Sequence, residues 1–418
     1  MRSRVAGLVL CLAVTTVACA GNWPSWRGPG FDGVVREGTG YPTHWSKTEN
    51  VLWKVNLPGK GASTPVVWGD RIVLTCAIDG KSGVLCLDLA GKPVWQKTVG
   101  SEKAGKHAKA TGCNPSATTD GKHLYVYFKS GDLVCLDFAG NIIWQHNLQD
   151  LFGADTLWWD LGTSPVLARD NVVVAVMQTG PSYLVAFNKI TGKQAWKHDR
   201  NLEAPEEAAQ SYSSPVVVTE KERETIVVLG ADHVTAHDAA SGQELWRVGG
   251  LNPTNHKYFR SIASPVVLDG VVVAPYARGA TLTAIRLGGS GDVTRSQVAW
   301  TKENLGADVP SPAAVDGKVY LCTDKGELSC LDVQTGKVLW SGLVEKNRNA
   351  FSSSPVIADG KVYLTREDGK TFVVEQGKEF KLLAANELGE GEFVVATPVL
   401  VNGRILIRSV DHLYCIGK

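Results

Sequence analysis

Residues 311–340 read SPAAVDGKVYLCTDKGELSCLDVQTGKVLW, and this stretch decides the fold. Three turn signals, at residues 316–317, 324–326 and 335–337, divide it into four short runs. Glycine accepts a positive φ at such positions, and aspartate closes a local turn. The runs between the turns alternate and are rich in β-branched and aromatic residues, as strands are. The stretch therefore predicts a four-stranded antiparallel meander that ends at Trp340.

The same unit repeats along the chain. Its first strand opens with Ser-Pro or Thr-Pro, and one slot instead holds Asn114-Pro115. The prolines of the other slots are Pro65, Pro165, Pro215, Pro265, Pro312, Pro355 and Pro398. The aromatic residues that close the units are Trp95, Trp144, Trp196, Trp246, Trp300 and Trp340, with Phe380 in the seventh slot. Intervals of 43 to 50 residues between successive prolines indicate a propeller of repeated sheets.

The eighth unit ends at residues 413–415 and has no fourth strand of its own. An unassigned strand, residues 51–55, stands ahead of the first proline. A ring in which this strand completes the last blade explains both features. The sequence therefore predicts an all-β fold, an eight-bladed β-propeller of four-stranded antiparallel blades closed by an N-terminal strand.

The repeat implies one domain, residues 50–418, because a single blade cannot bury both faces of its sheet. Residues 21–49 form an irregular segment rich in Gly and Pro, with two tryptophans and an arginine at residues 23–27. We expect it to pack onto the propeller, and a peptide-like docking motif is the alternative. Forty-three basic and 42 acidic residues give a formal charge of +1, which provides no field for nucleic acid or an anionic membrane surface. We expect a monomer without a nucleic-acid partner.

Residues 1–20 have the pattern of a secretory signal peptide. Arg2 and Arg4 precede an apolar run too short to span a bilayer, and residues 18–20 are small, as at a cleavage site. The same region is close to a bacterial lipobox, with Thr16 where Leu is usual, and Cys19 would then be lipidated. Both alternatives predict an exported protein of the periplasm or cell envelope. Only the second attaches it to a membrane, through a lipid anchor.

Four cysteines occupy the same third-strand position in different blades, which is typical of a small buried apolar side chain. They are Cys86, Cys135, Cys330 and Cys415. Cys76 and Cys322 stand across hairpins from two of them, so cross-strand disulfides are an alternative to buried thiols, which we expect. The chain has no Cys-x-x-Cys motif, so neither a zinc ribbon nor a covalent haem is indicated.

The loops at the two ends of each predicted sheet differ. Turns from the first to the second strand and from the third to the fourth are short and similar, as at residues 269–270 and 191–193. Links from one blade to the next are longer and share no common sequence. They lie with the second-to-third turns at the other end, which we call the loop-rich face; the end with the short turns is the turn face. Variable loops on a rigid scaffold carry binding residues, so we expect function on the loop-rich face.

Charged and aromatic residues from several blades gather on the loop-rich face as candidate binding residues. They are Lys106, His107, Trp158, Trp159, Asp160, Arg260, Tyr276, Arg278, Arg348 and Arg366. Paired tryptophans beside carboxylates, facing arginine and tyrosine, could hold a planar or polyanionic ligand. The alternative is that Trp158 and Trp159 pack between blades while the charges form a solvated rim.

We find no constellation of catalytic or metal-binding residues in the sequence. Ser214 and Ser354 stand at blade starts, where serine closes local turns. His233 and His237 lie on one side of a predicted strand without a nearby carboxylate or thiol, a pattern typical of packing. We therefore expect no catalytic residue and no metal.

Two stretches, AFNKITGKQAW at residues 186–196 and CLDVQTGKVLW at residues 330–340, resemble the tryptophan-docking repeat of the pyrroloquinoline quinone (PQQ) propeller superfamily. The resemblance covers the chain from Trp53 to its end. It implies the fold and leaves the function open, since the superfamily holds quinoprotein alcohol dehydrogenases, which use PQQ and calcium, and an outer-membrane assembly lipoprotein without a cofactor. The signal, the Trp-Arg-Gly-Pro segment and the eight blades together look like the secreted PQQ-like repeat proteins of bacteria.

The dehydrogenase pattern is incomplete in this chain. Adjacent cysteines, a haem motif, roofing insertions and the family's calcium and catalytic motifs around Asp155, Asp160 or Asp308 are not found in the sequence. The tryptophan that does match is structural. We therefore expect a non-catalytic exported scaffold, without a cofactor, that binds a protein or another ligand on its loop-rich face. The alternatives are a quinone-linked oxidoreductase with PQQ and calcium, and a polysaccharide- or polymer-binding partner of a hydrolase.

Overall fold

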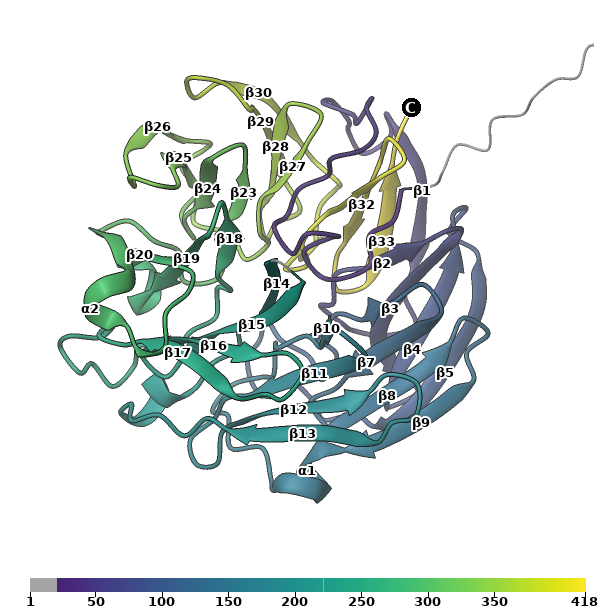
Figure 1. Cartoon of the computed structure of the whole chain (residues 1–418). Coiled ribbons are helices and arrows are strands. Elements are labelled where there is room, and N and C mark those ends of the chain that lie inside the picture. Colours follow the sequence, from purple (N-terminus) through teal and green to yellow (C-terminus); the bar gives the residue numbers. More distant parts are fainter. Residues whose placement is uncertain (1–20, 221) are drawn as a thin grey trace, which may run out of the picture.

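The computed structural model describes residues 21–220 and 222–418, whose strands form eight sheets arranged as the blades of one ring (Figure 1). Seven sheets have four antiparallel strands, and the fourth blade gains a short parallel fifth strand. The predicted eight-bladed all-β propeller is therefore confirmed. The predicted signal peptide and Cys19 lie outside the described residues.

The first four blades follow one another along the chain. Blade 1 contains β2 (Val66–Trp68), β3 (Arg71–Ile78), β4 (Lys81–Asp88) and β5 (Pro93–Ser101). Blade 2 contains β6 (Thr118–Thr119), β7 (His123–Tyr127), β8 (Asp132–Asp137) and β9 (Ile142–Asn147). Blade 3 contains β10 (Val166–Ala168), β11 (Asn171–Val176), β12 (Tyr183–Asn188) and β13 (Gln194–Asp199). Blade 4 contains β14 (Val216–Glu220), β15 (Arg223–Gly230), β16 (His233–Asp238), β17 (Glu244–Val248) and the added β21 (Gly291–Asp292).

The remaining blades continue this order up to the last. Blade 5 contains β18 (Val266–Leu268), β19 (Val271–Tyr276), β20 (Thr281–Arg286) and β22 (Val298–Glu303). Blade 6 contains β23 (Ala313–Val315), β24 (Lys318–Cys322), β25 (Glu327–Asp332) and β26 (Val338–Leu343). Blade 7 contains β27 (Val356–Ala358), β28 (Lys361–Thr365), β29 (Thr371–Glu375) and β30 (Leu382–Asn386). Blade 8 contains β31 (Val399–Val401), β32 (Arg404–Arg408), β33 (His412–Ile416) and, from the other end of the chain, β1 (Val51–Asn56).

Helices are short and lie in the loops. They are α1 (Leu148–Phe152), α2 (Thr294–Gln297) and the 3-10 turns η1 (Glu206–Ala209) and η2 (Ala277–Gly279). Across residues 21–220 and 222–418, none of the helices has the length and apolar character needed to cross a membrane.

The outer strand of most blades carries a tryptophan that packs on the next blade. Trp144, for example, covers Gly192 and donates its Nε1–H to the Lys189 carbonyl at 3.1 Å. Gly192 has φ 68°, and a Cβ there would lie 2.6 Å from the indole, so this turn requires glycine. The third-to-fourth-strand pairing puts a tryptophan in this slot in seven blades: Trp53, Trp95, Trp144, Trp196, Trp246, Trp300 and Trp340.

Blade 7 departs from this pattern, and the prediction that Phe380 closes it was wrong. Val373 pairs with Ala384, in the position where Cys330 of blade 6 pairs with Trp340. Phe380 comes before β30, too close to the third strand β29 to reach the position that Ala384 occupies. Its ring instead packs 6.1 Å from that of Trp340. Aromatic character without the correct spacing was a misleading signal.

A closed ring of hydrogen bonds joins all eight blades at the starts of their first strands. The backbone N–H of a Ser or Thr donates to the hydroxyl oxygen of its counterpart in the next blade, at 2.8–3.2 Å. These residues, which we call the hydroxyl ring, are Thr64, Ser116, Ser164, Ser214, Ser264, Ser311, Ser354 and Thr397. The hydroxyls therefore connect blades, and the prediction that serine closes local turns at Ser214 and Ser354 was wrong.

The start of blade 2 also differs from the prediction. Ser116 holds its place in the hydroxyl ring, and Ala117 follows where other blades have proline. Asn114-Pro115 was therefore placed in the repeat two residues too early. Asn114 instead closes a loop, because its Oδ1 accepts the Thr111 N–H at 2.8 Å.

The N-terminal segment lies against the first strands near the centre of the ring, as the purple chain in Figure 1 shows. Trp23 pairs through its backbone with Val67 of blade 1, and Val34 with Ile357 of blade 7. Between them Arg27 is buried and donates to the carbonyls of Pro312, at 2.9 Å, and Pro355, at 3.1 Å. This segment also contacts the short first-to-second turns. In blade 1 the Gly69 N–H donates to Asn22 of the segment, and in blade 7 Asp359 accepts the N–H of Gly40 of the segment. It therefore packs on the propeller, at the turn face.

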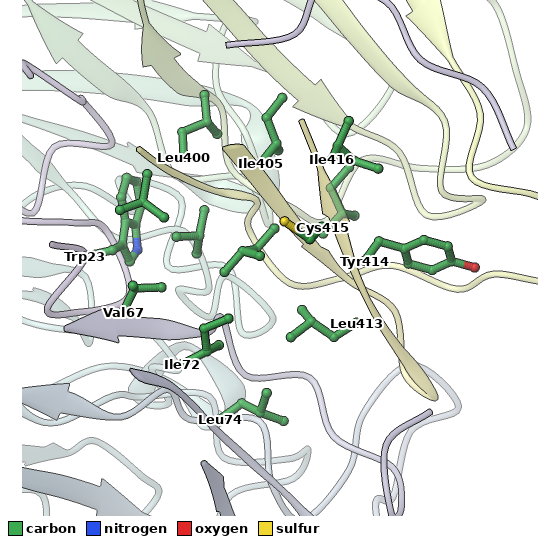
Figure 2. Packing of buried hydrophobic residues seen from close by; sticks show 14 of the residues in the cluster. Trp23, Val67, Ile72, Leu74, Leu400, Ile405, Leu413, Tyr414, Cys415 and Ile416 are labelled. Atoms are coloured by element: carbon green, nitrogen blue, oxygen red, sulfur yellow. The ribbon is translucent and has the colours of Figure 1, made fainter. Parts of the chain in front are cut away.

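The apolar core lies between neighbouring sheets. Its largest cluster joins blade 8 to blade 1 across the closure of the ring (Figure 2). Figure 2 shows Val67 and Ile72 on one side and Leu400 and Ile405 on the other, with Trp23 beside them. The N-terminal segment thus covers the junction that β1 completes.

Seven cysteines fall within the described residues, and all are buried free thiols, as expected. The strand register explains why the hairpin cysteines do not meet. Cys76 pairs with Gly83 and Cys86 with Val73, so these two thiols are not cross-strand neighbours. Cys322 and Cys330 are offset in the same way, opposite Leu328 and Tyr320.

Glu392 links the closing strand to the rest of blade 8. Its carboxylate accepts a hydrogen bond from Lys54 Nζ of β1 at 3.1 Å and contacts His412 Nδ1 at 3.1 Å and the Tyr414 hydroxyl. Burial by itself would raise the pKa of Glu392, but hydrogen bonds from Ser409, Tyr414, Lys54 and His412 outweigh it and lower the pKa from 4.5 to about 2. The ionised carboxylate therefore stabilises the closure.

Glu392→Gln is expected to lower the free energy of unfolding at neutral pH and to reduce its loss in acid. Because the folded pKa lies below the ordinary value, the stabilisation is present above about pH 4.5 and disappears as the pH falls toward about 2. Urea unfolding at several pH values measures this: the gap between wild type and variant should shrink with acidification. Glu390→Gln, at an exposed carboxylate nearby, is the control and should show a small constant effect. A Glu392→Gln gap that does not change with pH would contradict the assignment.

Candidate functional site

A cavity of about 550 Å³ lies among the blade links and second-to-third turns at the centre of the ring. This volume is within the roughly 300–1,000 Å³ of small-molecule sites. Its charged and aromatic lining residues are Trp26, His107, Lys109, Trp159, Asp160, Tyr212, Arg260, Arg278, Asp308 and Asp324. Members of the hydroxyl ring also line it, and Trp26 comes from the N-terminal segment that packs at the turn face. We therefore place the mouth of the cavity on the loop-rich face and Trp26 at its inner end.

Asp160 organises one wall of the cavity. Its carboxylate accepts the backbone N–H groups of Lys106, at 2.8 and 2.9 Å, and of His107, at 2.9 Å. It also forms an ion pair with Lys129, and both side chains are almost fully buried. Asp160 therefore holds the links into blades 2 and 3 together, and Lys129 neutralises its charge.

Arg260 organises another part of the wall. Its guanidinium donates two hydrogen bonds to Asp308, at 2.9 and 3.0 Å, and lies 3.5 Å from Glu207. The side chain is only 10% exposed, and its buried Nε is the atom that lies 3.5 Å from Glu207 Oε1, an ion-pair contact without hydrogen-bond geometry. Glu207 in turn accepts the Nε1–H of Trp159 at 2.8 Å, so one buried network orients both an arginine and an aromatic ring.

Arg278 lies on η2, in the second-to-third turn of blade 5. Ala277 and Arg278 both have left-handed backbone, with φ 53° and 54°, which is uncommon for residues with a side chain. The Arg278 guanidinium lines the cavity and lies 3.7 Å from Glu207. Backbone strain of this kind recurs at ligand-binding positions, because the surrounding structure must hold the residue in place.

Two further groups complete the wall. Lys109 Nζ donates to both carboxylate oxygens of Glu367, at 2.6 and 2.8 Å, and Ser352 donates to the same carboxylate. Asp324 accepts the backbone N–H groups of Asp308 and Val309. Burial and the neighbouring Asp308 charge raise the pKa of Asp324 above its ordinary value.

Five of the ten candidate residues line this cavity together: His107, Trp159, Asp160, Arg260 and Arg278. Trp158 and Trp159 are 43% and 40% exposed, so neither is buried between blades. The alternative of a solvated charged rim was wrong for Asp160 and Arg260, whose side chains are buried in ion pairs.

The other candidates lie outside the cavity. Lys106 Nζ donates to the Leu157 carbonyl at 2.6 Å, next to the wall. Tyr276 is buried and donates to Asp232 at 2.5 Å, while Arg366 is buried between Glu345 and Asp368. These contacts give Tyr276 and Arg366 structural roles. Arg348 is exposed on the link into blade 7.

Several lining residues were not among the candidates. Trp26 belongs to the segment that was predicted to pack on the propeller or to form a docking motif, and Asp324 to a predicted turn. The hydroxyl ring had a sequence signal, the Ser or Thr that recurs before proline, but its meaning depends on contacts between blades. Lys109 stood beside two candidates, and no sequence feature showed that it would meet Glu367, 258 residues away.

A calcium ion does not fit the lining carboxylates. Asp160 is bonded to Lys129 and two backbone N–H groups, and Asp308 is held by both ends of the Arg260 guanidinium. Within the part of the chain that the structure describes, no three His, Cys, Asp or Glu side chains are grouped to hold a metal ion.

His237, on a strand of blade 4, bonds to Gly242 and Thr235, and burial lowers its pKa to about 3, so it is neutral.

Solved propellers of two functional kinds share this fold. The crystal structure of BamB from Moraxella catarrhalis aligns with a TM-score of 0.64 and 16% identity, covering 88% of this chain and 99% of that one. A europium-containing methanol dehydrogenase aligns with a TM-score of 0.68 and 13% identity, covering 94% and 90%. At such identities the likeness concerns the fold alone.

Sequence comparison is more specific. The outer membrane protein assembly factor BamB of Yersinia pestis is 28% identical over 290 residues, which are 66% of this chain and 65% of that protein. BamB of Shewanella oneidensis is 24% identical over 277 residues, 63% and 62% of the two chains. The chain thus matches less than two thirds of the length of these relatives. Residues 33–199, 161–295 and 290–380 match the family pattern described as outer membrane protein assembly factor BamB, and the chain belongs to this family.

Proposed function

We propose that this protein is a non-catalytic, exported propeller scaffold that holds a protein partner on its loop-rich face in the cell envelope. Family membership supports a scaffold, because the relatives are named for their part in outer membrane protein assembly. We infer a partner of the same general kind, an envelope protein or a component that assembles one.

Exposed aromatic side chains on this face carry the proposal. Trp158, Trp159 and Tyr258 are 43%, 40% and 39% exposed, and we call them the aromatic rim. Large exposed aromatics are enriched among the residues that dominate protein interfaces. On a face formed by loops, they provide apolar area that a partner can bury.

Hydrogen bonds between three consecutive links hold this rim in place. The Trp158 N–H donates to Gln210 Oε1 at 2.9 Å, and the Ala208 N–H donates to the Lys257 carbonyl at 3.1 Å. The links into blades 3, 4 and 5 are thereby connected. A preorganised surface loses less conformational entropy on binding, which favours partner capture.

The test is affinity capture from solubilised envelope membranes of the native organism with the wild-type protein and two variants. Trp158→Ala combined with Tyr258→Ala should lose the captured proteins while its melting temperature stays nearly unchanged, since exposed substitutions usually shift stability by about 0.5 kcal/mol or less. The matched control is Ile190→Ala with Lys193→Ala, which removes exposed side chains from the turn face. It should capture the same proteins as wild type. Capture that survives the rim variant, or that fails equally in both, would refute the proposal.

A further inference from the structure

We propose that the central cavity is a binding site for a short neutral saccharide. This inference deepens the proposed function, on which it rests for the choice of the loop-rich face, by assigning a small ligand to the cavity beside the aromatic rim. It follows from three properties of the lining: its balanced charge, its surplus of hydrogen-bond donors and its aromatic surfaces.

The acidic and basic side chains of the lining are equal in number. Three are cationic and three are carboxylates: Lys109, Arg260, Arg278, Asp160, Asp308 and Asp324. Most already have a charged partner, as in the contacts of Arg260 with Asp308, Lys109 with Glu367 and Asp160 with Lys129. The lining carboxylates would repel a polyanion, and the lining cations would repel a polycation. The lining therefore favours a ligand that is polar and uncharged.

Hydrogen-bond donors face the cavity without acceptors of their own. Five hydroxyl-ring residues line it: Thr64, Ser116, Ser164, Ser214 and Thr397. Each hydroxyl oxygen accepts a backbone N–H from the neighbouring blade, which leaves its own proton free to donate. A buried donor without a partner is unfavourable, so a ligand rich in hydroxyl oxygens would satisfy this array.

Two tryptophans supply the apolar part of the site. Trp159 lines the wall, where its Nε1–H is held by Glu207 and its ring meets His107 edge-on at 5.6 Å. Trp26 lies at the inner end. The face of an aromatic ring is electron-rich and attracts the C–H groups on one side of a sugar ring. The aromatic faces thus match the C–H side of a sugar ring, and the paired acids and arginines beside them match its hydroxyl groups.

The test measures binding of cellotriose, maltotriose and chitotriose by titration calorimetry, with trigalacturonic acid as the charged probe. We expect saturable binding of at least one neutral trisaccharide, with a Kd that stays within about twofold when NaCl rises tenfold, since an uncharged ligand has no charge to screen. Trp159→Ala should weaken that binding roughly tenfold or more. Arg278→Ala, at a side chain that is 45% exposed, should weaken it severalfold without a change in melting temperature.

Trp158→Ala is the matched control, because this adjacent tryptophan is equally exposed and does not line the cavity. It should leave the Kd unchanged. The inference is overturned if none of the three neutral trisaccharides binds, if Trp158→Ala and Trp159→Ala lose binding equally, or if only trigalacturonic acid binds and does so only at low salt. Failure here is separable from failure of the proposed function, since partner capture is read from membrane extract with the Trp158 and Tyr258 variant.

Discussion

Deletion of residues 21–56 is expected to leave the propeller unclosed and prone to aggregation. Without β1, the strand β33 loses the partner with which it pairs from Val51–Ile416 to Asn56–His412. Its unpaired N–H and C=O groups would form an exposed sheet edge, which recruits other chains. Size-exclusion chromatography with light scattering should show oligomers or an aggregate in place of a monomer.

Deletion of residues 21–49 is the matched control, because it removes the same N-terminal segment and keeps β1. This shorter deletion should be destabilised and still monomeric. Trp53→Ala separates the side chain from the strand: the ring is partly buried, so we expect a loss of about 2–4 kcal/mol, around the lower end of values for buried tryptophan. Equal size and equal urea midpoints for the two deletions would show that β1 does not close the ring.

Arg27→Ala is expected to be the most destabilising single substitution in the N-terminal segment. The guanidinium is buried between the first strands of blades 6 and 7, where burial lowers its pKa to about 10 and the charge of Asp32 partly offsets this effect, so it is cationic at neutral pH. Its loss would leave the Pro312 and Pro355 carbonyls without this donor and open a cavity. We expect a decrease of roughly 2–5 kcal/mol in the free energy of unfolding, measured in urea.

Arg36→Ala is the control for charge in the same segment. Arg36 forms an ion pair with Asp32, but more than half of its side chain is exposed. Such a pair contributes about 0–1 kcal/mol, so this variant should differ little from wild type. Similar losses for the two substitutions would mean that Asp32, and not the strand carbonyls, is the important partner of Arg27.

The fold was predictable because its signals are local and repeated. Three signals recur in several blades: short turns such as residues 335–337, alternating strands and the spacing of the tryptophans. An irregular signal in one blade therefore did not change the predicted number of blades. Both errors in the repeat arose where one blade departs from the common spacing. Phe380 has the right chemistry at the wrong distance, and Asn114-Pro115 has the right proline two residues early.

The site was predictable only in part, because its geometry depends on contacts between distant links. Charged and aromatic residues could be assigned to the loop-rich face from the topology. Which of them meet could not, since Arg260 is 48 residues from Asp308 and Trp159 is 48 residues from Glu207. The sequence likewise gives no measure of burial, which separates Arg366, held in ion pairs, from Arg278, which faces the cavity.

The pairing of β1 with β33 delays completion of the fold until β33 is available. Val55 pairs with Leu413, so β1 cannot take its place before β33 has been made. Contacts so far apart in sequence form slowly. Once formed, they leave neither end of the sheet region free to fray by itself, because each terminal strand is held by the other. Slow, all-or-none opening would protect such a ring from proteases that act on transiently unfolded chains.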